Sequence, residues 1–271
     1  MDTSTRPTAV AGAFYPGSGD ELERALVTLI PDEIAHHGLL ACIAPHAGYI
    51  FSGSVAGKLY GHLEVPRRVI VLGPNHSGTG DAVAVAPHRS WSTPIGPQPI
   101  DSELAERLIA AFPAARRDGR AHVREHSIEV QLPFLRRRRP DVVVLPICLA
   151  HLGLDDSLAL GRAIAEVVTE LDEPVGIVAS SDMSHYQPDD EARHLDHMAI
   201  EPALARDPET LYDTVHRHHI TMCGVVPATV ALTAANALGA TDAHLVAYAT
   251  SGDVNGNYDQ VVGYAGVCVH A

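Results

Sequence analysis

The segment Ala44-Pro45-His46-Ala47-Gly48-Tyr49 joins a short apolar run, residues 39–44, to a polar loop that carries a histidine. Two later segments repeat this arrangement. Gly73-Pro74-Asn75-His76-Ser77-Gly78 follows the run 69–72, and Ser180-Ser181-Asp182-Met183-Ser184-His185-Tyr186 follows the run 175–179. Apolar runs of this length are typical of buried strands. Open α/β sheets place their sites outside the carboxyl ends of such strands, so we expect the three histidines to converge on one point.

The rest of the chain alternates between strand and helix patterns, which favours an α/β fold with a largely parallel, mixed sheet flanked by helices. No linker is long enough to divide residues 1–271, so the sequence predicts a single domain. Strands are expected at 39–44, 67–72, 82–86, 142–149, 175–179, 244–250 and 261–269, with a polar turn at 251–258. Helices are expected at 20–29, 54–63, 101–112, 125–138, 155–171, 189–205, 208–219 and 226–238, with N-caps at Ser54, Asp101 and Asp155. The helix 125–138 can continue past Pro133 only if that residue kinks it.

Two segments each allow two interpretations. Residues 6–16 form either an ordered arm against the site or plain edge structure. The loop 90–99, which contains the only tryptophan, Trp91, either walls a pocket or is a surface excursion.

Composition excludes several classes of function. The 271 residues carry a net charge of −14, which disfavours nucleic acid or an anionic membrane as the main partner. No apolar stretch approaches the length of a membrane span, and residues 1–7 are polar and lack a signal-peptide core. Four cysteines do not make a disulfide framework in a chain this long. We therefore expect a protein of the reducing cytoplasm.

His46, His76 and Cys223 are the candidate metal ligands, because neutral imidazole and thiolate bind iron, zinc and copper well. Cys223 precedes a predicted helix, a position that we expect to lower the thiol pKa and to expose the sulfur. The other cysteines sit inside apolar runs, where a thiol behaves as a small hydrophobe: Cys42, Cys148 and Cys268. The alternative for each histidine is a hydrogen bond that anchors its loop. We expect most of the seventeen histidines to be solvated or held by such local bonds.

Asp182 and His185 are the candidate catalytic residues, since a histidine near a carboxylate in a polar pocket can serve as a general acid or base. Asp182 either orients His185, binds metal or caps the turn. His126 either belongs to a helix N-terminus beside Glu125 or points into the same crevice. Further candidate pocket residues lie in the same loops: Tyr49, Asn75 and Ser184. The sequence has no G-x-S-x-G elbow, which disfavours a serine hydrolase.

At these residues the chain resembles a known family. The segments that carry the resemblance are RP at 6–7, AGAFYP at 11–16, APHAGYIFSG at 44–53, GPNHSG at 73–78, EHSIEVQLPFL at 125–135, SSDMSHY at 180–186 and MCG at 222–224. They resemble the Memo family (mediator of cell motility), whose bacterial and archaeal members are called AmmeMemoRadiSam system protein B. That family is similar in fold to the class III extradiol dioxygenases, which are non-haem iron enzymes that open catechol rings.

The resemblance implies a role for each candidate. His46 and His76 match the two histidine ligands of the dioxygenases, and Cys223 matches the Memo-family residue that stands where those enzymes have glutamate. His185 matches their acid/base histidine, with Asp182 beside it. The implied metal is Fe(II), with copper or zinc as alternatives. A thiolate in place of a carboxylate makes the site softer and more easily oxidised.

Two functions from different classes follow from the resemblance. The first is a non-haem iron or copper redox enzyme of the oxygenase type, which acts on an unknown small molecule, or with radical-SAM and AMMECR-type partner proteins. The second is a non-catalytic metal-binding or adaptor protein that binds peptides on a vestigial dioxygenase fold. Eukaryotic members are described as binding phosphotyrosine peptides, but nothing basic near this crevice suggests that here. A bound redox metal with an open coordination position would favour the enzyme.

Overall fold

The centre of the fold is a group of parallel strands with apolar side chains on both faces. A computed structural model describes residues 4–31 and 37–271; residues 1–3 of the polar N-terminal stretch lie outside the described residues. The central order is β3 (Ala41–Ala44), β11 (Val175–Ser180), β5 (Arg68–Pro74) and β10 (Val143–Leu149), all parallel. Nearly every residue of these strands is buried, as expected for strands covered on both sides.

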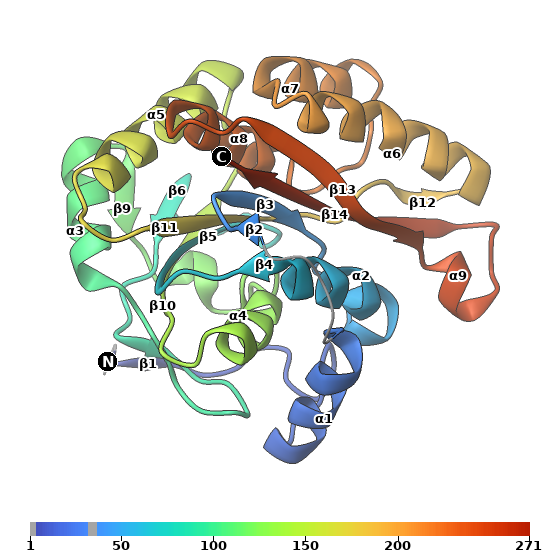
Figure 1. Cartoon of the computed structure of the whole chain (residues 1–271), viewed down its shortest axis with the longest axis horizontal. Helices are drawn as coiled ribbons and strands as arrows, with labels where there is room; N and C mark the ends of the chain where they lie inside the picture. Colours follow the sequence, from blue (N-terminus) through green and yellow to red (C-terminus); the bar gives the residue numbers. More distant parts are fainter. Residues whose placement is uncertain (1–3, 32–36) are drawn as a thin grey trace.

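Further strands extend this sheet at both ends. β14 (Val261–His270) runs antiparallel to β3, and both β13 (Asp242–Thr250) and β12 (His185–Gln187) pair with β14. At the other end β6 (Val83–Val85) runs antiparallel to β10, and β9 (Ala115–Arg117) pairs with β6. The predicted α/β fold with a mixed, partly parallel sheet is confirmed (Figure 1).

Helices cover both faces of the sheet and divide the core into two layers (Figure 1). One face is packed by α3 (Ser102–Ala111), α5 (Leu154–Thr169), α6 (Asp189–Leu204), α7 (Pro208–Arg217) and α8 (Val225–Ala237). The opposite face is packed by α1 (Gly19–Leu29), α2 (Tyr49–His62) and α4 (Leu132–Arg138). None of the helices in the described part of the chain is long and apolar enough to span a membrane.

Helix starts agree with the sequence prediction only in part. Asp101 caps α3 by accepting a hydrogen bond from the Leu104 N–H, as predicted. The predicted cap at Ser54 is wrong, because α2 begins five residues earlier, after Gly48. The predicted cap at Asp155 is also wrong: Gly153 caps α5, and Asp155 lies in its first turn, where its charge suits the positive end of the helix dipole.

The predicted helix over 125–138 is shorter than expected. A 3-10 turn, η2 (Glu129–Gln131), leads into α4, and Pro133 stands at the start of α4, where its missing N–H costs no hydrogen bond. The preceding residues are not helical, and there the Glu125 carboxylate accepts the backbone N–H groups of His126 and Ser127. The predicted helix start at 125 is therefore wrong, and Pro133 begins a helix instead of kinking one.

Short elements complete the fold. The N-terminal arm contributes β1 (Thr5–Arg6), which pairs with β7 (Ser90–Trp91) and through it with β8 (Gln98–Pro99). The loop 90–99 thus packs against the arm, and Trp91 is fully buried under the Arg6 guanidinium, 4.1 Å from its ring centroid. β2 (His37–Gly38) pairs with β4 (Leu63–Glu64), η1 (Arg120–His122) follows β9, and α9 (Gly252–Asn255) occupies the expected turn between β13 and β14.

Candidate metal centre

Three loops at one end of the sheet bring His46, His76 and Cys223 together. His46 follows β3, His76 follows β5, and Cys223 immediately precedes the N-cap of α8. A ring nitrogen of each histidine and the Cys223 sulfur all lie within 4.8 Å of one another. The parallel order of β3, β11 and β5 explains why His46 and His76 converge, because the carboxyl ends of these strands lie at the same edge. Cys223 reaches them from the loop before α8.

Hydrogen bonds fix the tautomer of His46. Ser180 Oγ donates its only hydrogen to the Ser127 carbonyl at 2.6 Å and accepts an N–H from Gln131 at 2.8 Å. His46 Nδ1, 3.0 Å from the same Ser180 Oγ, must therefore be the donor of that contact. This leaves the Nε2 lone pair facing the Cys223 sulfur at 3.2 Å. Burial and the neighbouring imidazoles hold the pKa of His46 well below its usual range, so the ring stays neutral.

Glu125 orients the imidazole ring of His76. Its carboxylate accepts the His76 backbone N–H at 2.8 Å and His76 Nδ1 at 3.0 Å. A carboxylate only accepts, so Nδ1 carries a proton, and Nε2 is open to a ligand once the ring is neutral. Burial lowers the pKa of His76, but the hydrogen bond and the charge of Glu125 outweigh burial and raise it. Burial alone would raise the pKa of Glu125, but the His76 contacts and the donated backbone N–H groups lower it to about 2. A carboxylate that orients a ligating histidine is a recurrent feature of metal sites.

The N-terminal arm anchors the segment that carries Glu125. The Arg6 guanidinium is buried and donates to the backbone carbonyls of His122 and Glu125, at 2.6 and 2.7 Å. It also forms an ion pair with the buried Glu129. Of the two interpretations of residues 6–16, the ordered arm is the one that the structure shows, and it reaches the site through Glu125.

The environment of Cys223 differs from the expectation. Burial, together with the nearby negative charge of Asp182, raises the pKa of the Cys223 thiol, where the position ahead of a helix had predicted a lowered one. The side chain is partly buried and its sulfur lies 3.7 Å from the Asp182 carbonyl. The predicted pKa shift is therefore wrong, because burial outweighs the helix end. A metal cation would reverse this balance, since a coordinating thiol is deprotonated. All four cysteines are free, and the other three are buried.

Asp182 anchors the His46 loop. Its Oδ1 accepts the backbone N–H of His46 at 2.7 Å and that of Ala47 at 3.3 Å. Burial raises its pKa to about 6, although the N–H donated by His46 opposes the shift. The carboxylate of Asp182 thus bonds to the backbone of the His46 loop.

His185 opens β12 with a fixed tautomer. Its Nδ1 lies 2.9 Å from the Thr221 carbonyl, which only accepts, so Nδ1 carries a proton and Nε2 is the ring nitrogen left for other contacts. The backbone N–H of His185 donates to Thr221 Oγ1 at 2.7 Å. Thr221 is two residues from Cys223, so these bonds tie the His185 loop to the loop of the candidate thiol ligand.

Of the remaining candidate residues, His126 and Asn75 lie at or near the His76 loop, whereas Tyr49 and Ser184 make their contacts elsewhere. His126 stacks on His76 with ring centroids 4.7 Å apart, and Asn75 braces its own loop by donating to the Thr79 carbonyl. Tyr49 points away from the site, into the core, where its hydroxyl donates to the Val130 carbonyl. Ser184 donates its backbone N–H to the buried carboxylate of Asp196.

A pocket of about 970 Å³ opens beside the candidate ligands. Its wall includes His76 and Cys223 together with Asn75, residues 149–153 and the end of α7 with the residues that follow it. Among the described residues, those that line it include no lysine or arginine. Neither Trp91 nor the rest of the loop 90–99 takes part in this wall.

Comparison with known proteins decides the family. A profile of Memo-like proteins matches residues 6–268. The chain belongs to the Memo family. A MEMO1 family protein of Aquifex aeolicus is 43% identical over 264 residues, which cover 97% of this chain and 98% of the relative. Another, of Methanopyrus kandleri, is 41% identical over 276 residues, with 97% and 98% covered. An uncharacterised protein of Escherichia coli K12 has a similar solved structure, with a TM-score of 0.55, 13% identity, and 85% and 99% of the two chains covered; this likeness supports the fold alone.

Sequence reasoning missed the groups that orient the candidate ligands in this Memo-family chain. Ser180 and Gln131 hold His46, and Glu125 holds His76. The only signal was that Glu125 stands next to His126 in a polar segment, for which the sequence allowed either a helix N-terminus or a histidine that points into the crevice. The partners of a ring nitrogen depend on which loops meet in space, and spacing along the chain does not reveal them.

Proposed function

We propose that this Memo-family protein is a redox metalloenzyme of the oxygenase type that binds iron or copper through His46, His76 and Cys223. The observation that carries the proposal is the approach of three potential ligand atoms to within 4.8 Å. Metal–nitrogen distances near 2.0 Å and metal–sulfur distances near 2.3 Å separate tetrahedral ligands by about 3.5 Å. His46 Nε2 and Cys223 Sγ, 3.2 Å apart, lie close to that spacing.

The donor set supports the choice of metal. Two neutral imidazoles and one thiolate suit iron, copper and zinc, and they suit magnesium and calcium poorly. Bound iron or copper would supply one-electron and oxygen chemistry that side chains lack. The protein's contribution is to give Nδ1 of each imidazole an internal partner, so that Nε2 is the nitrogen left for the metal, and to leave the pocket open beside His76 and Cys223.

His185 is the residue that we propose to move a proton. Its Nδ1 proton is engaged by the Thr221 carbonyl, so its Nε2 is the nitrogen free to accept a proton from a substrate hydroxyl and to return it to the product. Its backbone N–H and Nδ1 both bond to Thr221, two residues from Cys223, which supports a place beside the site. Asp182 would act as a positioning residue through its two bonds to the His46 loop.

Metal analysis tests the ligand set. Protein purified without oxygen and loaded with Fe(II) would be dialysed, and its iron measured by mass spectrometry. His46→Ala and Cys223→Ser should each lose most of the iron. Cys42→Ser is the matched control, because Cys42 is a buried thiol in β3, outside the group of three ligands. Equal iron in Cys223→Ser and the wild type would remove Cys223 from the site.

A substrate screen tests catalysis. Oxygen uptake with catechols and related dihydroxy-aromatics would identify a substrate class. His185→Ala should then keep its iron and lose about 10²–10⁴-fold in turnover, the usual range for a general acid/base. If His185→Ala emptied the site as His46→Ala does, His185 would be a ligand. If metal-free variants kept full biological activity in cells, the protein would be a binder or adaptor and the enzymatic proposal would fail.

A further inference from the structure

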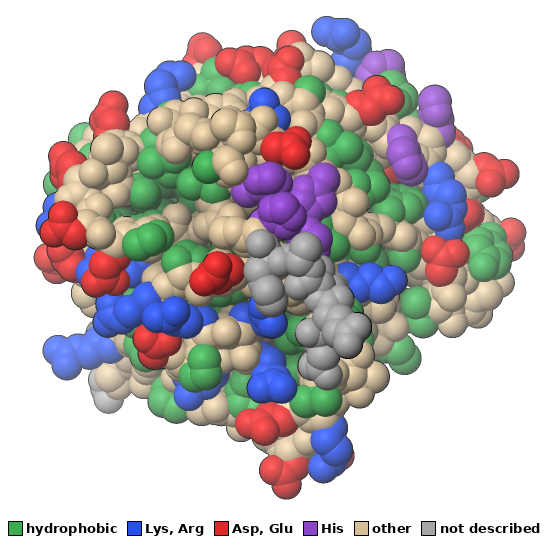
Figure 2. All heavy atoms as spheres, viewed as in Figure 1, with side chains coloured by type: hydrophobic (Ala, Val, Ile, Leu, Met, Phe, Trp, Pro, Cys, Tyr) green, Lys and Arg blue, Asp and Glu red, His purple; other side chains and the backbone are tan. Residues whose placement is uncertain are grey.

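A second group of histidines lies at the far edge of the sheet, away from the proposed metal centre. His37 is in β2, His62 is in the last turn of α2, and His244 is in the edge strand β13. Figure 2 shows histidine side chains gathered at the surface over the region where Figure 1 places β2 and the pair β13–β14. His270, at the end of β14, stacks on His37 with ring centroids 4.3 Å apart.

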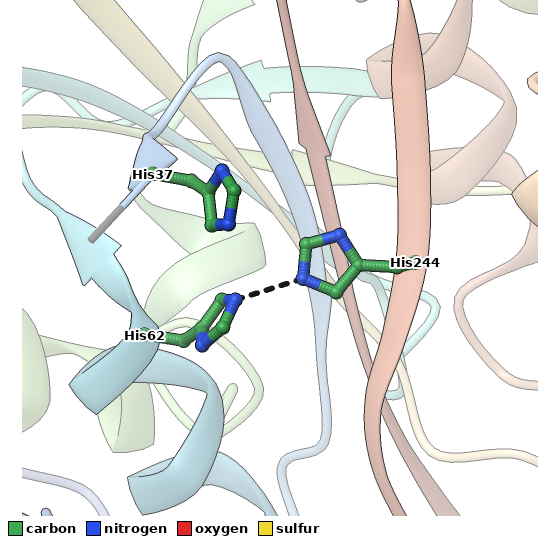
Figure 3. Close-up of side chains that lie close together, drawn as sticks. All are labelled: His37, His62 and His244. Carbon is green, nitrogen blue, oxygen red and sulfur yellow. Dashed lines mark hydrogen bonds between the residues drawn. The ribbon is translucent and has the colours of Figure 1, made fainter. Parts of the chain in front are cut away.

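The three rings point toward one another from three separate elements (Figure 3). His62 Nε2 and His244 Nε2 are 2.8 Å apart, and the His37 and His62 ring centroids are 4.9 Å apart. One ring nitrogen of each of His37, His62 and His244 lies within 4.8 Å of those of the other two. All three side chains are partly buried, so their positions are set by packing as well as by solvent.

We propose that His37, His62 and His244 form a second metal site, which binds a divalent ion of the zinc–copper class through three imidazoles. In the N···N contact between His62 and His244, one hydrogen is shared between two rings that are both good ligands. A metal ion would replace that hydrogen. Metal–nitrogen distances near 2.05 Å separate tetrahedral nitrogens by about 3.3 Å, so the two rings need to part by only about 0.5 Å.

The surroundings suit a cation with neutral ligands. Burial and the nearby rings of His37 and His270 lower the pKa of His244, which favours its neutral, metal-binding form. The Asp242 carboxylate lies 3.9 Å from His270 Nε2 and supplies negative charge at the rim. Imidazole ligands without carboxylate or thiolate select zinc, copper or nickel over magnesium and calcium.

A bound ion would join three elements at this edge, of which β2 is the least held by other contacts. β2 pairs only with the two-residue strand β4, and β13 pairs with β14 alone in the described part of the chain. α2 packs against β13 beside the site. The ion would therefore clamp the end of α2 and β2 onto the edge of the main sheet.

The test measures Zn²⁺ and Cu²⁺ in a full-length chain whose first site is disabled by His46→Ala and Cys223→Ser. Equilibrium dialysis followed by elemental analysis should still find bound Zn²⁺, in a one-to-one ratio with the chain. Adding His62→Gln and His244→Gln should weaken this binding at least 100-fold, because loss of even an outer partner of a ligand costs about 10–100-fold. His194→Gln, on an exposed face of α6, is the matched control and should leave binding unchanged.

Spectroscopy separates the two sites. Co²⁺ at His46, His76 and Cys223 should give a sulfur-to-cobalt charge-transfer band, which the second site lacks because it has nitrogen ligands only. Cu²⁺ in the chain without the first site should show nitrogen couplings in its electron paramagnetic resonance spectrum, and these should disappear in the His62→Gln, His244→Gln chain.

The proposal is overturned if the chain without the first site binds no Zn²⁺ or Cu²⁺ while its circular dichroism shows a folded protein. It is also overturned if the His62→Gln, His244→Gln chain binds as much metal as the His194→Gln control. Because each outcome is read with the first site removed, a failure of the second site leaves the proposed function untouched.

Discussion

Replacing Glu129 by glutamine should lower the free energy of unfolding by about 3–5 kcal/mol, the usual cost of leaving one member of a buried ion pair uncompensated. Glu129 is fully buried, and its two oxygens accept four hydrogen bonds, from the Arg6 guanidinium, the Ala9 and Val10 N–H groups and the Tyr15 hydroxyl. Oε1 accepts the Val10 N–H and Oε2 accepts the Ala9 N–H. Wherever the new amide –NH₂ stands, it faces a backbone donor.

The loss is large beside the typical total stability of about 5–15 kcal/mol, so urea unfolding followed by circular dichroism should resolve it easily. Glu173→Gln is the matched control, because Glu173 is half exposed where it pairs with Arg67. Exposed pairs of this kind contribute about 0–1 kcal/mol. The same Glu129→Gln chain should lose amide-exchange protection first around residues 122–129, since Arg6 also holds the carbonyls of His122 and Glu125.

A loss below about 1 kcal/mol in Glu129→Gln would refute this reasoning, because it would mean that the buried pair is as weak as an exposed one. If the variant were destabilised but kept its amide-exchange protection at residues 122–129, the predicted link between Arg6 and this segment would be refuted. In that case the arm would stabilise the fold without holding the segment that carries Glu125.

Two further predictions concern His122 and Gly73. Burial, helped by the Arg6 charge, lowers the pKa of His122 to about 3. Between about pH 6.5 and pH 3 this histidine therefore binds a proton in the unfolded chain but not in the folded one. The free energy of unfolding should fall as the pH falls through this range, by up to about 1.4 kcal/mol per pH unit. His122→Gln should flatten the slope of unfolding free energy between pH 6.5 and pH 4.5, and an equal slope in both chains would contradict the assignment. In Gly73→Ala, the new Cβ would lie 2.6 Å from Ile128 Cγ1 and would crowd the segment beside Glu125, so we expect a loss of about 1–3 kcal/mol and weaker metal retention. Gly38→Ala, where nothing lies within 4 Å, should change stability by less than about 0.5 kcal/mol, and equal losses in both variants would exclude crowding as the cause.

Local pattern was sufficient for the elements that are both apolar and regular. The runs at 69–72, 142–149 and 175–179 became central strands because a continuous apolar segment is stable only when helices cover both of its faces. Helix starts were less reliable. α2 begins at Tyr49 and contains Gly53 and Gly57, whose missing side chains let Leu29 of α1 approach the helix closely. This packing involves another helix and is not visible in the local sequence, from which Ser54 was the predicted N-cap.

The sequence by itself determined the order of strands and helices and the residue types at the ends of β3, β5 and β11, because hydrophobic periodicity and loop composition are local properties. Only the tertiary structure decided which partners surround them. Ser180 and Gln131 at His46, Glu125 at His76 and the raised pKa of the Cys223 thiol all depend on loops that meet across the sheet edge. The tertiary structure also brings His37, His62 and His244 together. These three residues are far apart in the sequence, where nothing distinguishes them from solvated histidines. Hydrogen bonding, burial and ligand spacing are set by distances in space, and the chain fixes those distances only once it has folded.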